Sequence, residues 1–201
     1  MRQETASMAY TARSYDAMSN INQLHHVAQR RKKMDEDKKI IAIDPDVDKS
    51  GIAVVNATKK IVEKAGKIEI AELCEFFRLN ADKRIKVIVE AGWLNVSNWH
   101  LQASCKYVRN PMARAAKIGY STGENHRVGK IIIEIARYFG IEVEEMKPLI
   151  KCWSGHDKKI TAEEIKAITG YSERTNQDVR DAILLAWVGA NLPIRIISAK
   201  K

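Results

Sequence analysis

Between about residues 39 and 92, hydrophobic residues come in short β-branched runs that are separated by turn-forming residues. The runs IIAIDPD, SGIAVVN and KKIVEKAGKIEI predict three consecutive strands in an antiparallel meander. AELCEFFRLN then carries apolar residues at helical spacing, whereas the following run RIKVIVEAG is too short for a typical helix. This order predicts a crossover helix that leads into a parallel strand.

The pattern after residue 92 changes to longer helical segments. A helix is predicted over roughly residues 125–139, with an apolar stripe formed by Val128, Ile131, Ile132 and Ile135. IEVEEMKP predicts a fifth strand, and TAEEIKAITG predicts a short helix with a threonine cap and a terminating glycine. A last helix is expected over residues 176–191, so the fold class is α/β.

The chain has room for one domain and an appendage. Its 201 residues, 45% of them hydrophobic, are enough for one good core but few for two. Residues 1–37 are polar with one segment of helical spacing, and we interpret them as a partly helical extension. Residues 38–201 are expected to form the domain.

Composition narrows the partners and the compartment. The formal net charge of +9 is dispersed along the chain, which favours a folded basic surface and an anionic partner such as nucleic acid. Three widely separated cysteines without a CxxC pair indicate neither a disulfide framework nor a zinc knuckle, and fit a reducing cytoplasm. The first residues lack a signal-peptide core and no apolar run is long enough for a membrane span, so we expect a soluble cytoplasmic protein.

Four acidic residues stand where a metal site needs them. Asp44 and Glu90 end two strands of the sheet, and Asp178 and Asp181 lie three apart on one face of the last helix. Each alone is more often structural, but the last helix is otherwise almost wholly apolar, and two carboxylates there repel one another unless a cation lies between them. Oxygen ligands select Mg²⁺ or Mn²⁺, and two such ions can promote phosphodiester hydrolysis.

The motifs that carry these residues resemble those of a known family. IAIDPDVDKSGIAVV, VIVEAGW and DVRDAILLA, in this order, resemble the three acidic motifs of the RuvC family of Holliday junction resolvases, and the resemblance covers about residues 39–190. It implies a ribonuclease H-like fold, with a mixed five-stranded sheet and helices on both faces. It also implies that Asp44, Glu90, Asp178 and Asp181 form a catalytic tetrad that binds two Mg²⁺ ions, with Mn²⁺ as a substitute.

The resemblance also implies a substrate and an assembly. RuvC-like resolvases are homodimers that hydrolyse two opposed strands of a four-way DNA junction, leaving 5′-phosphate and 3′-hydroxyl ends. The segment after NHRVGK resembles part of their dimer surface, and a bacterial or viral origin would follow. The sequence departs from the family at Asp46, where a glycine is usual, and at Asp48. These residues either shape a tight turn or alter metal affinity.

Several further residues are candidates for holding DNA. Trp93 follows Glu90 closely, where the family carries an aromatic thought to enter the junction centre, and base stacking or core packing would each suit Trp93 and Trp99. His156 is a candidate for proton transfer. The candidates for phosphate contact are Arg109, Arg114, Lys117, Lys151, Lys158 and Lys159.

Other functions remain open at this point. Sugar-kinase and actin-like ATPases share the fold, but they need a second copy of it, which this chain lacks. A non-catalytic DNA-binding relative would gain by losing the carboxylates, which repel phosphate. A ribonuclease H-like nuclease acting on flap DNA or RNA is the nearest alternative, because the tetrad specifies the chemistry and not the substrate.

Overall fold

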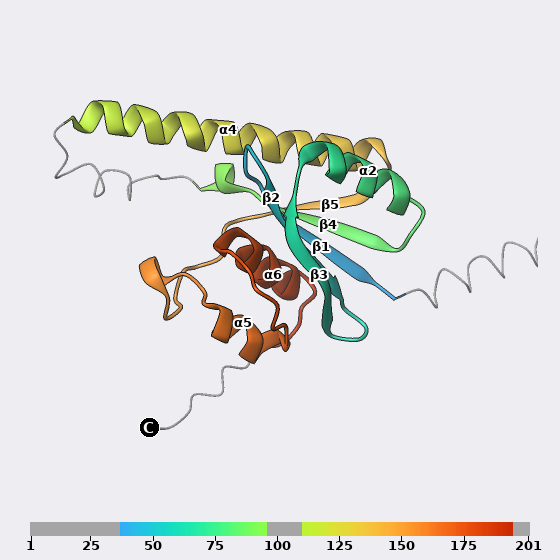
Figure 1. The fold of residues 1–201 in the computed structure, drawn as a ribbon. Helices are drawn as coiled ribbons and strands as arrows, with labels where there is room; N and C mark the ends of the chain where they lie inside the picture. The colour runs from blue at the N-terminus through green and yellow to red at the C-terminus, as the bar shows by residue number, and fades with distance from the viewer. Residues whose placement is uncertain (1–36, 96–109, 195–201) are drawn as a thin grey trace, which may run out of the picture. The chain divides into compact units, whose positions relative to one another are not determined.

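The computed structural model describes residues 37–95 and 110–194, and its centre is one five-stranded sheet (Figure 1). The strands follow the order β3-β2-β1-β4-β5 across the sheet. β1 and β3 are each antiparallel to β2, whereas β4 runs parallel to β1 and β5 runs parallel to β4. The bounds are β1 Lys39–Asp44, β2 Ser50–Asn56, β3 Ile61–Ile68, β4 Ile85–Glu90 and β5 Glu142–Met146.

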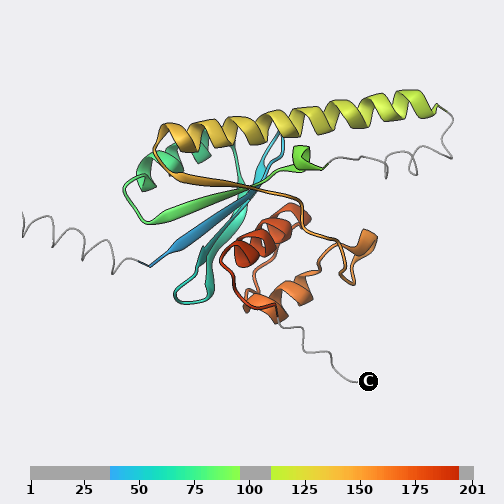
Figure 2. The same ribbon diagram turned by 180° about the vertical axis from the view of Figure 1, so that it is seen from behind.

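Helices cover both faces of this sheet, as Figures 1 and 2 show from opposite sides. Helix α2 (Ile70–Asn80) connects β3 to β4, and α4 (Pro111–Tyr138) connects β4 to β5 on the same face. Helices α5 (Ala162–Thr169) and α6 (Gln177–Gly189) lie on the other face, and two short 3₁₀ turns are η1 (Gly92–Leu94) and η2 (His156–Lys158). The predicted α/β fold, with a mixed five-stranded sheet and helices on both faces, is confirmed.

Side chains that point alternately to the two faces of the sheet divide the core into two layers, one on each face. On β1, Ile40 and Ala42 pack toward α6, whereas Ile41 and Ile43 pack toward α2 and α4. Successive strand side chains point to opposite faces, so a strand buried on both sides must be apolar throughout. This requirement explains the unbroken run IIAI.

The two C-terminal helices begin and end at the predicted signals. Thr161 caps α5 by accepting a hydrogen bond from the Glu164 backbone N–H, and Gly170 ends the helix in the left-handed region at φ 76°. Asn176 caps α6 by accepting from the Val179 backbone N–H at 3.1 Å. These contacts confirm the short helix and the start of the last one.

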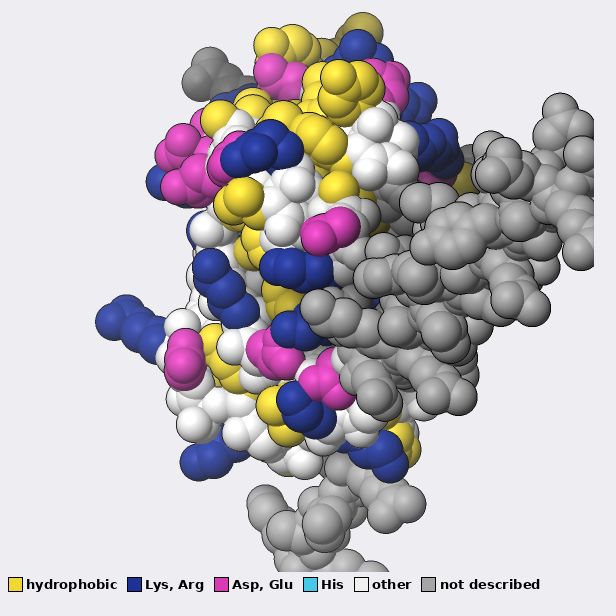
Figure 3. Space-filling view, turned by 90° about the vertical axis from the view of Figure 1, so that its right-hand side faces the viewer, with side chains coloured by type: hydrophobic (Ala, Val, Ile, Leu, Met, Phe, Trp, Pro, Cys, Tyr) yellow, Lys and Arg dark blue, Asp and Glu magenta, His cyan; other side chains and the backbone are white. Residues whose placement is uncertain are grey.

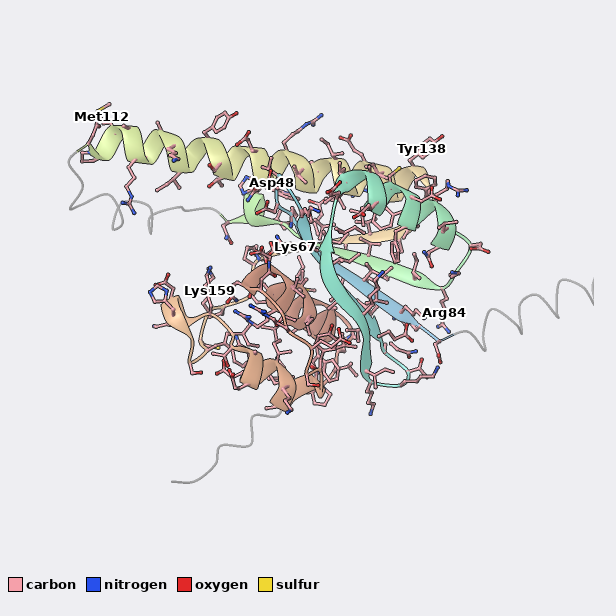
Figure 4. All side chains as sticks on the ribbon, viewed as in Figure 1. Asp48, Lys67, Arg84, Met112, Tyr138 and Lys159 are labelled. Atoms are coloured by element: carbon pink, nitrogen blue, oxygen red, sulfur yellow. The ribbon has the colours of Figure 1, made fainter. Side chains whose placement is uncertain are left out.

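Helix α4 is much longer than the 125–139 range that the apolar stripe indicated. It begins at Pro111, and the Asn110 side chain accepts a hydrogen bond from the Ala113 backbone N–H. Its first turns are exposed and extend beyond the sheet, with Met112 at the tip (Figure 4). Because this half packs against nothing in the described residues, it carries no apolar stripe by which periodicity could reveal it.

On the face drawn in Figure 3, lysine and arginine side chains are interspersed with acidic ones and form no continuous basic patch. None of the helices in the described ranges has the length and apolar character that a membrane crossing needs. The N-terminal extension, Trp99 and Arg109 lie outside the described residues.

Helix α6 lies so close to β2 that a side chain at Gly51 has no room. A Cβ placed there would lie 2.3 Å from the Asp178 carbonyl oxygen and 2.6 Å from its carbon, both backbone atoms. The Gly51→Ala substitution must therefore push α6 outward. We expect it to lower the free energy of unfolding by about 1–3 kcal/mol, as overpacked cores do.

Chemical denaturation of Gly51→Ala and Gly66→Ala checks this expectation. Gly66 lies on the neighbouring strand β3, and a Cβ there would meet no atom within 4 Å. Its variant should be as stable as the wild type or slightly more stable, since glycine weakens a strand. Equal stability of the two variants would contradict the close packing of α6.

Candidate active site

Four carboxylates from three separate elements line one cavity of about 210 Å³. Asp44 ends β1, Glu90 ends β4, and Asp178 and Asp181 lie in the first turns of α6. Strands β1 and β4 are parallel neighbours, so their carboxyl ends meet at the same edge of the sheet. The structure thus brings together all four of the acidic residues that the motifs indicated.

The buried position of these carboxylates opposes their ionisation. Burial raises the pKa of Asp44 to about 8, and the negative charges of Glu90, Asp181 and Asp178 contribute to the same shift. Burial, together with the charge of Asp181, raises the pKa of Glu90 to about 7. The pKa of Asp181 is also raised, chiefly by burial. A cavity of this kind favours a bound cation, which would remove the repulsion.

Two of the four carboxylates already have partners on the protein. The Lys67 ammonium donates to Asp178 Oδ2 at 2.5 Å, and the Gln177 side-chain amide donates to Asp181 Oδ1 at 2.8 Å. Within residues 37–95 and 110–194, no three His, Cys, Asp or Glu side chains are gathered closely enough to hold a metal ion as they stand. The donor set fits Mg²⁺ or Mn²⁺ in its chemistry, being four hard oxygen ligands. Sharing one ion would require these side chains to move.

Of the three candidate lysines in the loop between β5 and α5, two reach the cavity. Lys151 and Lys159 both line it, and the positive charge of Lys151 acts to lower the pKa of Glu90 and of Asp181. Lys158 is exposed and does not line the cavity. These positions identify which of the three loop lysines lie beside the carboxylates.

His156 does not lie among the groups that line the carboxylate cavity. Its side chain is 94% exposed in η2, and its Nδ1 lies 3.2 Å from Asp157 Oδ2 of the adjacent residue. A group that moves protons at the reacting atoms must lie within hydrogen-bonding reach of them. The geometry therefore gives no support to the expected role of His156 in proton transfer.

Trp93 has a well-defined packing environment. Its indole N–H donates to Glu145 Oε2 at 3.0 Å, its ring meets His126 edge-on at 5.7 Å, and the partly buried side chain packs against the core cluster beneath α4. A Cβ at Gly129 would lie 2.7 Å from the Trp93 ring. Of the two roles considered for Trp93, core packing is the one that these contacts support. Its contact with DNA stays a prediction.

A second cavity, of about 180 Å³, adjoins the first at Asp44 and Glu90. Helix α4 contributes Thr122, Asn125 and His126 to its lining. The His126 ring lies directly over Gly92, where a Cβ would be 2.8 Å from His126 Nε2. The two carboxylates can therefore be approached from the side of α4 as well as from the side of the lysines.

The remaining predicted residues lie apart from the carboxylates. Arg114 and Lys117 lie on the exposed first turns of α4, beside a shallow hollow that Asn125 also lines.

The Asp48 backbone N–H donates to Asp46 Oδ1 at 3.1 Å, and the Asp46 backbone N–H donates to Ser50 Oγ at 3.2 Å. Of the two alternatives for Asp46, its role in a tight turn is the one that these bonds support.

Three side chains that the sequence did not single out belong to the site. Gln177 precedes Asp181 by four residues, a spacing that places the two on one helical face, so helical periodicity could have revealed the pair. Lys67 on β3 and His126 on α4 reach the site only through the tertiary fold. Nothing in their local sequence distinguishes them from other surface residues.

A scan against models of protein families gave no match, and a search of the curated proteins gave none either. Among solved structures, the chain is similar to T. thermophilus RuvC in complex with a Holliday junction substrate. The sequence identity is 16%, the alignment covers 74% of this chain and 90% of that chain, and the TM-score is 0.43.

The raised pKa of Asp44 predicts a pH-dependent stability in the absence of divalent cations. The folded carboxyl has a pKa of about 8 against an ordinary value of 3.8, so between these limits the folded state holds a proton that the unfolded state has lost. Stability therefore falls as the pH rises through this window. The Asp44→Asn variant lacks the contribution of Asp44 to this dependence, and at pH 8 we expect it to be more stable than the wild type by at least about 1 kcal/mol, or roughly 2–4 °C in Tm.

Thermal unfolding in EDTA at pH 5 to 9 measures this difference. Asp82→Asn is the matched control, because Asp82 is an exposed carboxylate in the turn between α2 and β4. The control should follow the wild-type profile. If Asp44→Asn and the wild type have the same Tm at pH 8, Asp44 is not held in a repulsive, desolvated position.

Proposed function

We propose that the protein is a divalent-cation-dependent endonuclease that hydrolyses phosphodiester bonds in branched DNA, with the four-way junction as its principal substrate. The observation that carries the proposal is the gathering of Asp44, Glu90, Asp178 and Asp181 in one cavity beside Lys151 and Lys159. A protein that only bound DNA would gain by losing four acidic groups from such a place.

Each group has a role in this proposal. The four carboxylates hold Mg²⁺, or Mn²⁺ in its place, and the bound ions supply the activation of water and the stabilisation of the leaving oxygen. Lys151 and Lys159 bind the phosphates beside the cleaved bond, because they are the cations that line the cavity with the carboxylates. Hydrolysis would leave a 5′-phosphate and a 3′-hydroxyl.

The choice of substrate rests on the sequence motifs and on charge. The motifs around Asp44, Glu90 and Asp178 resemble those of junction resolvases, and the net charge of +9 suits a polyanion. Flap DNA and RNA–DNA hybrids are the other outcomes of the test. A cleavage assay that compares a four-way junction, a flap, a duplex and a hybrid separates these substrates.

Removing any one carboxylate should remove the activity and leave DNA binding intact. Asp44→Asn, Glu90→Gln, Asp178→Asn and Asp181→Asn are each expected to lower Mg²⁺-dependent cleavage by roughly a hundredfold or more, because each removes an anionic ligand. DNA affinity, measured by gel shift in Ca²⁺ or EDTA, should stay the same or increase. Asp82→Asn should cleave as the wild type does, and wild-type cleavage by any two of the four variants would refute the proposal.

We also propose that the protein acts as a homodimer, which paired cleavage of two strands requires. The segment after NHRVGK, which resembles a dimer surface, carries Ile132 and Ile133, and both are buried in the core layer between α4 and the sheet. The exposed first half of α4 is the better candidate for contact with a second copy. It presents Met112 and Tyr120, which are 84% and 69% exposed.

Light scattering at micromolar concentration tests the dimer. The wild type should have twice the mass of one chain, and Met112→Glu should shift the equilibrium toward the monomer, since a charge at an apolar contact opposes association. Tyr138→Glu is the control, because Tyr138 is equally exposed at the other end of α4 (Figure 4). A monomeric wild type, with and without junction DNA, would remove the basis for paired cleavage.

A further inference from the structure

Lys67 links the edge strand of the sheet to the acidic turn of α6. It lies on β3 in register with Gly51 of β2, and its ammonium donates to Asp178 Oδ2 and to the Lys49 carbonyl oxygen, both at 2.5 Å. Its side chain is 28% exposed and that of Asp178 is 38% exposed. Figure 4 labels Lys67 on β3.

The surrounding backbone fixes the position of this ion pair. Gly51 allows the Asp178 backbone to rest on β2, and the β2–β3 pairing places Lys67 beside Gly51. Within the part of the chain that the structure describes, Lys67 makes the ion pair to this carboxylate, whereas Lys151 and Lys159 line the cavity without a contact of 4.0 Å or less to any of the four. Asp178 thus has a cation of its own before any metal ion binds.

We propose that Lys67 is a built-in counter-ion that competes with a divalent cation for Asp178. The inference rests on the proposed function, in which Asp178 is a metal ligand. In the cation-free protein the Lys67 ammonium compensates the negative charge of Asp178. A metal ion that binds Asp178 must displace this ammonium. This competition agrees with the absence of any ready three-ligand group among the described residues.

Competition between Lys67 and a metal ion predicts two effects of removing the ammonium. The stability of the cation-free protein falls, whereas its affinity for the cation rises. Removing the ammonium leaves Asp178 uncompensated beside the other carboxylates, so the cation-free protein becomes less stable. In the protein without this ammonium, a metal ion that binds Asp178 no longer has to displace Lys67. The affinity of the protein for the cation therefore increases. A lysine that merely supported the fold would produce the first effect without the second.

Isothermal titration of the full chain with Mn²⁺, without DNA, tests the proposal together with thermal unfolding in EDTA. Lys67→Met should bind Mn²⁺ at least threefold more tightly than the wild type and melt at a lower temperature in EDTA. Lys64→Met is the matched control, since Lys64 is exposed on the same strand and pairs with Val54 of β2, whose side chain belongs to the core layer beneath α2. It should leave both quantities unchanged.

A double variant separates competition at Asp178 from a general change in charge. In the Asp178→Asn background, Lys67→Met should no longer change Mn²⁺ affinity, because the carboxylate for which the two cations compete is gone. An affinity for Mn²⁺ that is unchanged or weaker in Lys67→Met would overturn the proposal. So would an equal gain in affinity with and without the Asp178 carboxylate.

Cleavage of junction DNA, measured on the same variants, keeps the two proposals distinct. Tighter Mn²⁺ binding by Lys67→Met, with no cleavage by any form of the protein, would support the counter-ion and refute the nuclease. Cleavage by the wild type, with Mn²⁺ affinity indifferent to Lys67→Met, would support the nuclease and refute the counter-ion.

Discussion

The approach of α6 to the sheet is the constraint on which the site depends. At Gly51 the backbone of Asp178 rests directly on β2, and near the other end of the helix a Cβ at Gly189 would lie 1.9 Å from Ile88 of β4. Glycines at both points let an apolar helix lie close against the sheet. As a result, the acidic first turns of α6 stand beside the ends of β1 and β4, where Asp44 and Glu90 project.

This packing has an electrostatic cost that the protein offsets locally. Four carboxylates share a partly buried cavity, and the raised pKa values of Asp44 and Glu90 express the resulting desolvation and repulsion. Lys67 binds Asp178 and Gln177 binds Asp181. Lys151 and Lys159 add positive charge at the wall of the cavity. Such sites trade stability for function, since a well-folded core would not otherwise keep like charges together.

Local signals in the sequence predicted most of the fold. The β-branched runs and the caps at Thr161 and Asn176 belong to segments whose burial or hydrogen bonds are specified by their neighbours in the chain. The start of α4 was missed because apolar periodicity marks a helix only where it packs. The cap at Asn110 followed by Pro111 was a usable signal for that start. The sequence left Trp93 open between base stacking and core packing, because its partners, Glu145 and Gly129, lie on other elements.

The sequence by itself determined the strand and helix pattern, the two-sided burial of the central strands and the identity of the four carboxylates, because strand ends and helical spacing are local properties. Only the tertiary structure decided which cations and amides face those carboxylates. Lys67 and Asp178 are 111 residues apart in the sequence. Their contact depends on the pairing of β3 with β2 and on the close packing of α6 against β2. The path of the loop between β5 and α5 likewise decides that Lys151 and Lys159 line the cavity, whereas Lys158 does not and His156 is exposed to solvent. No periodicity encodes such contacts, because they arise from the packing of distant segments.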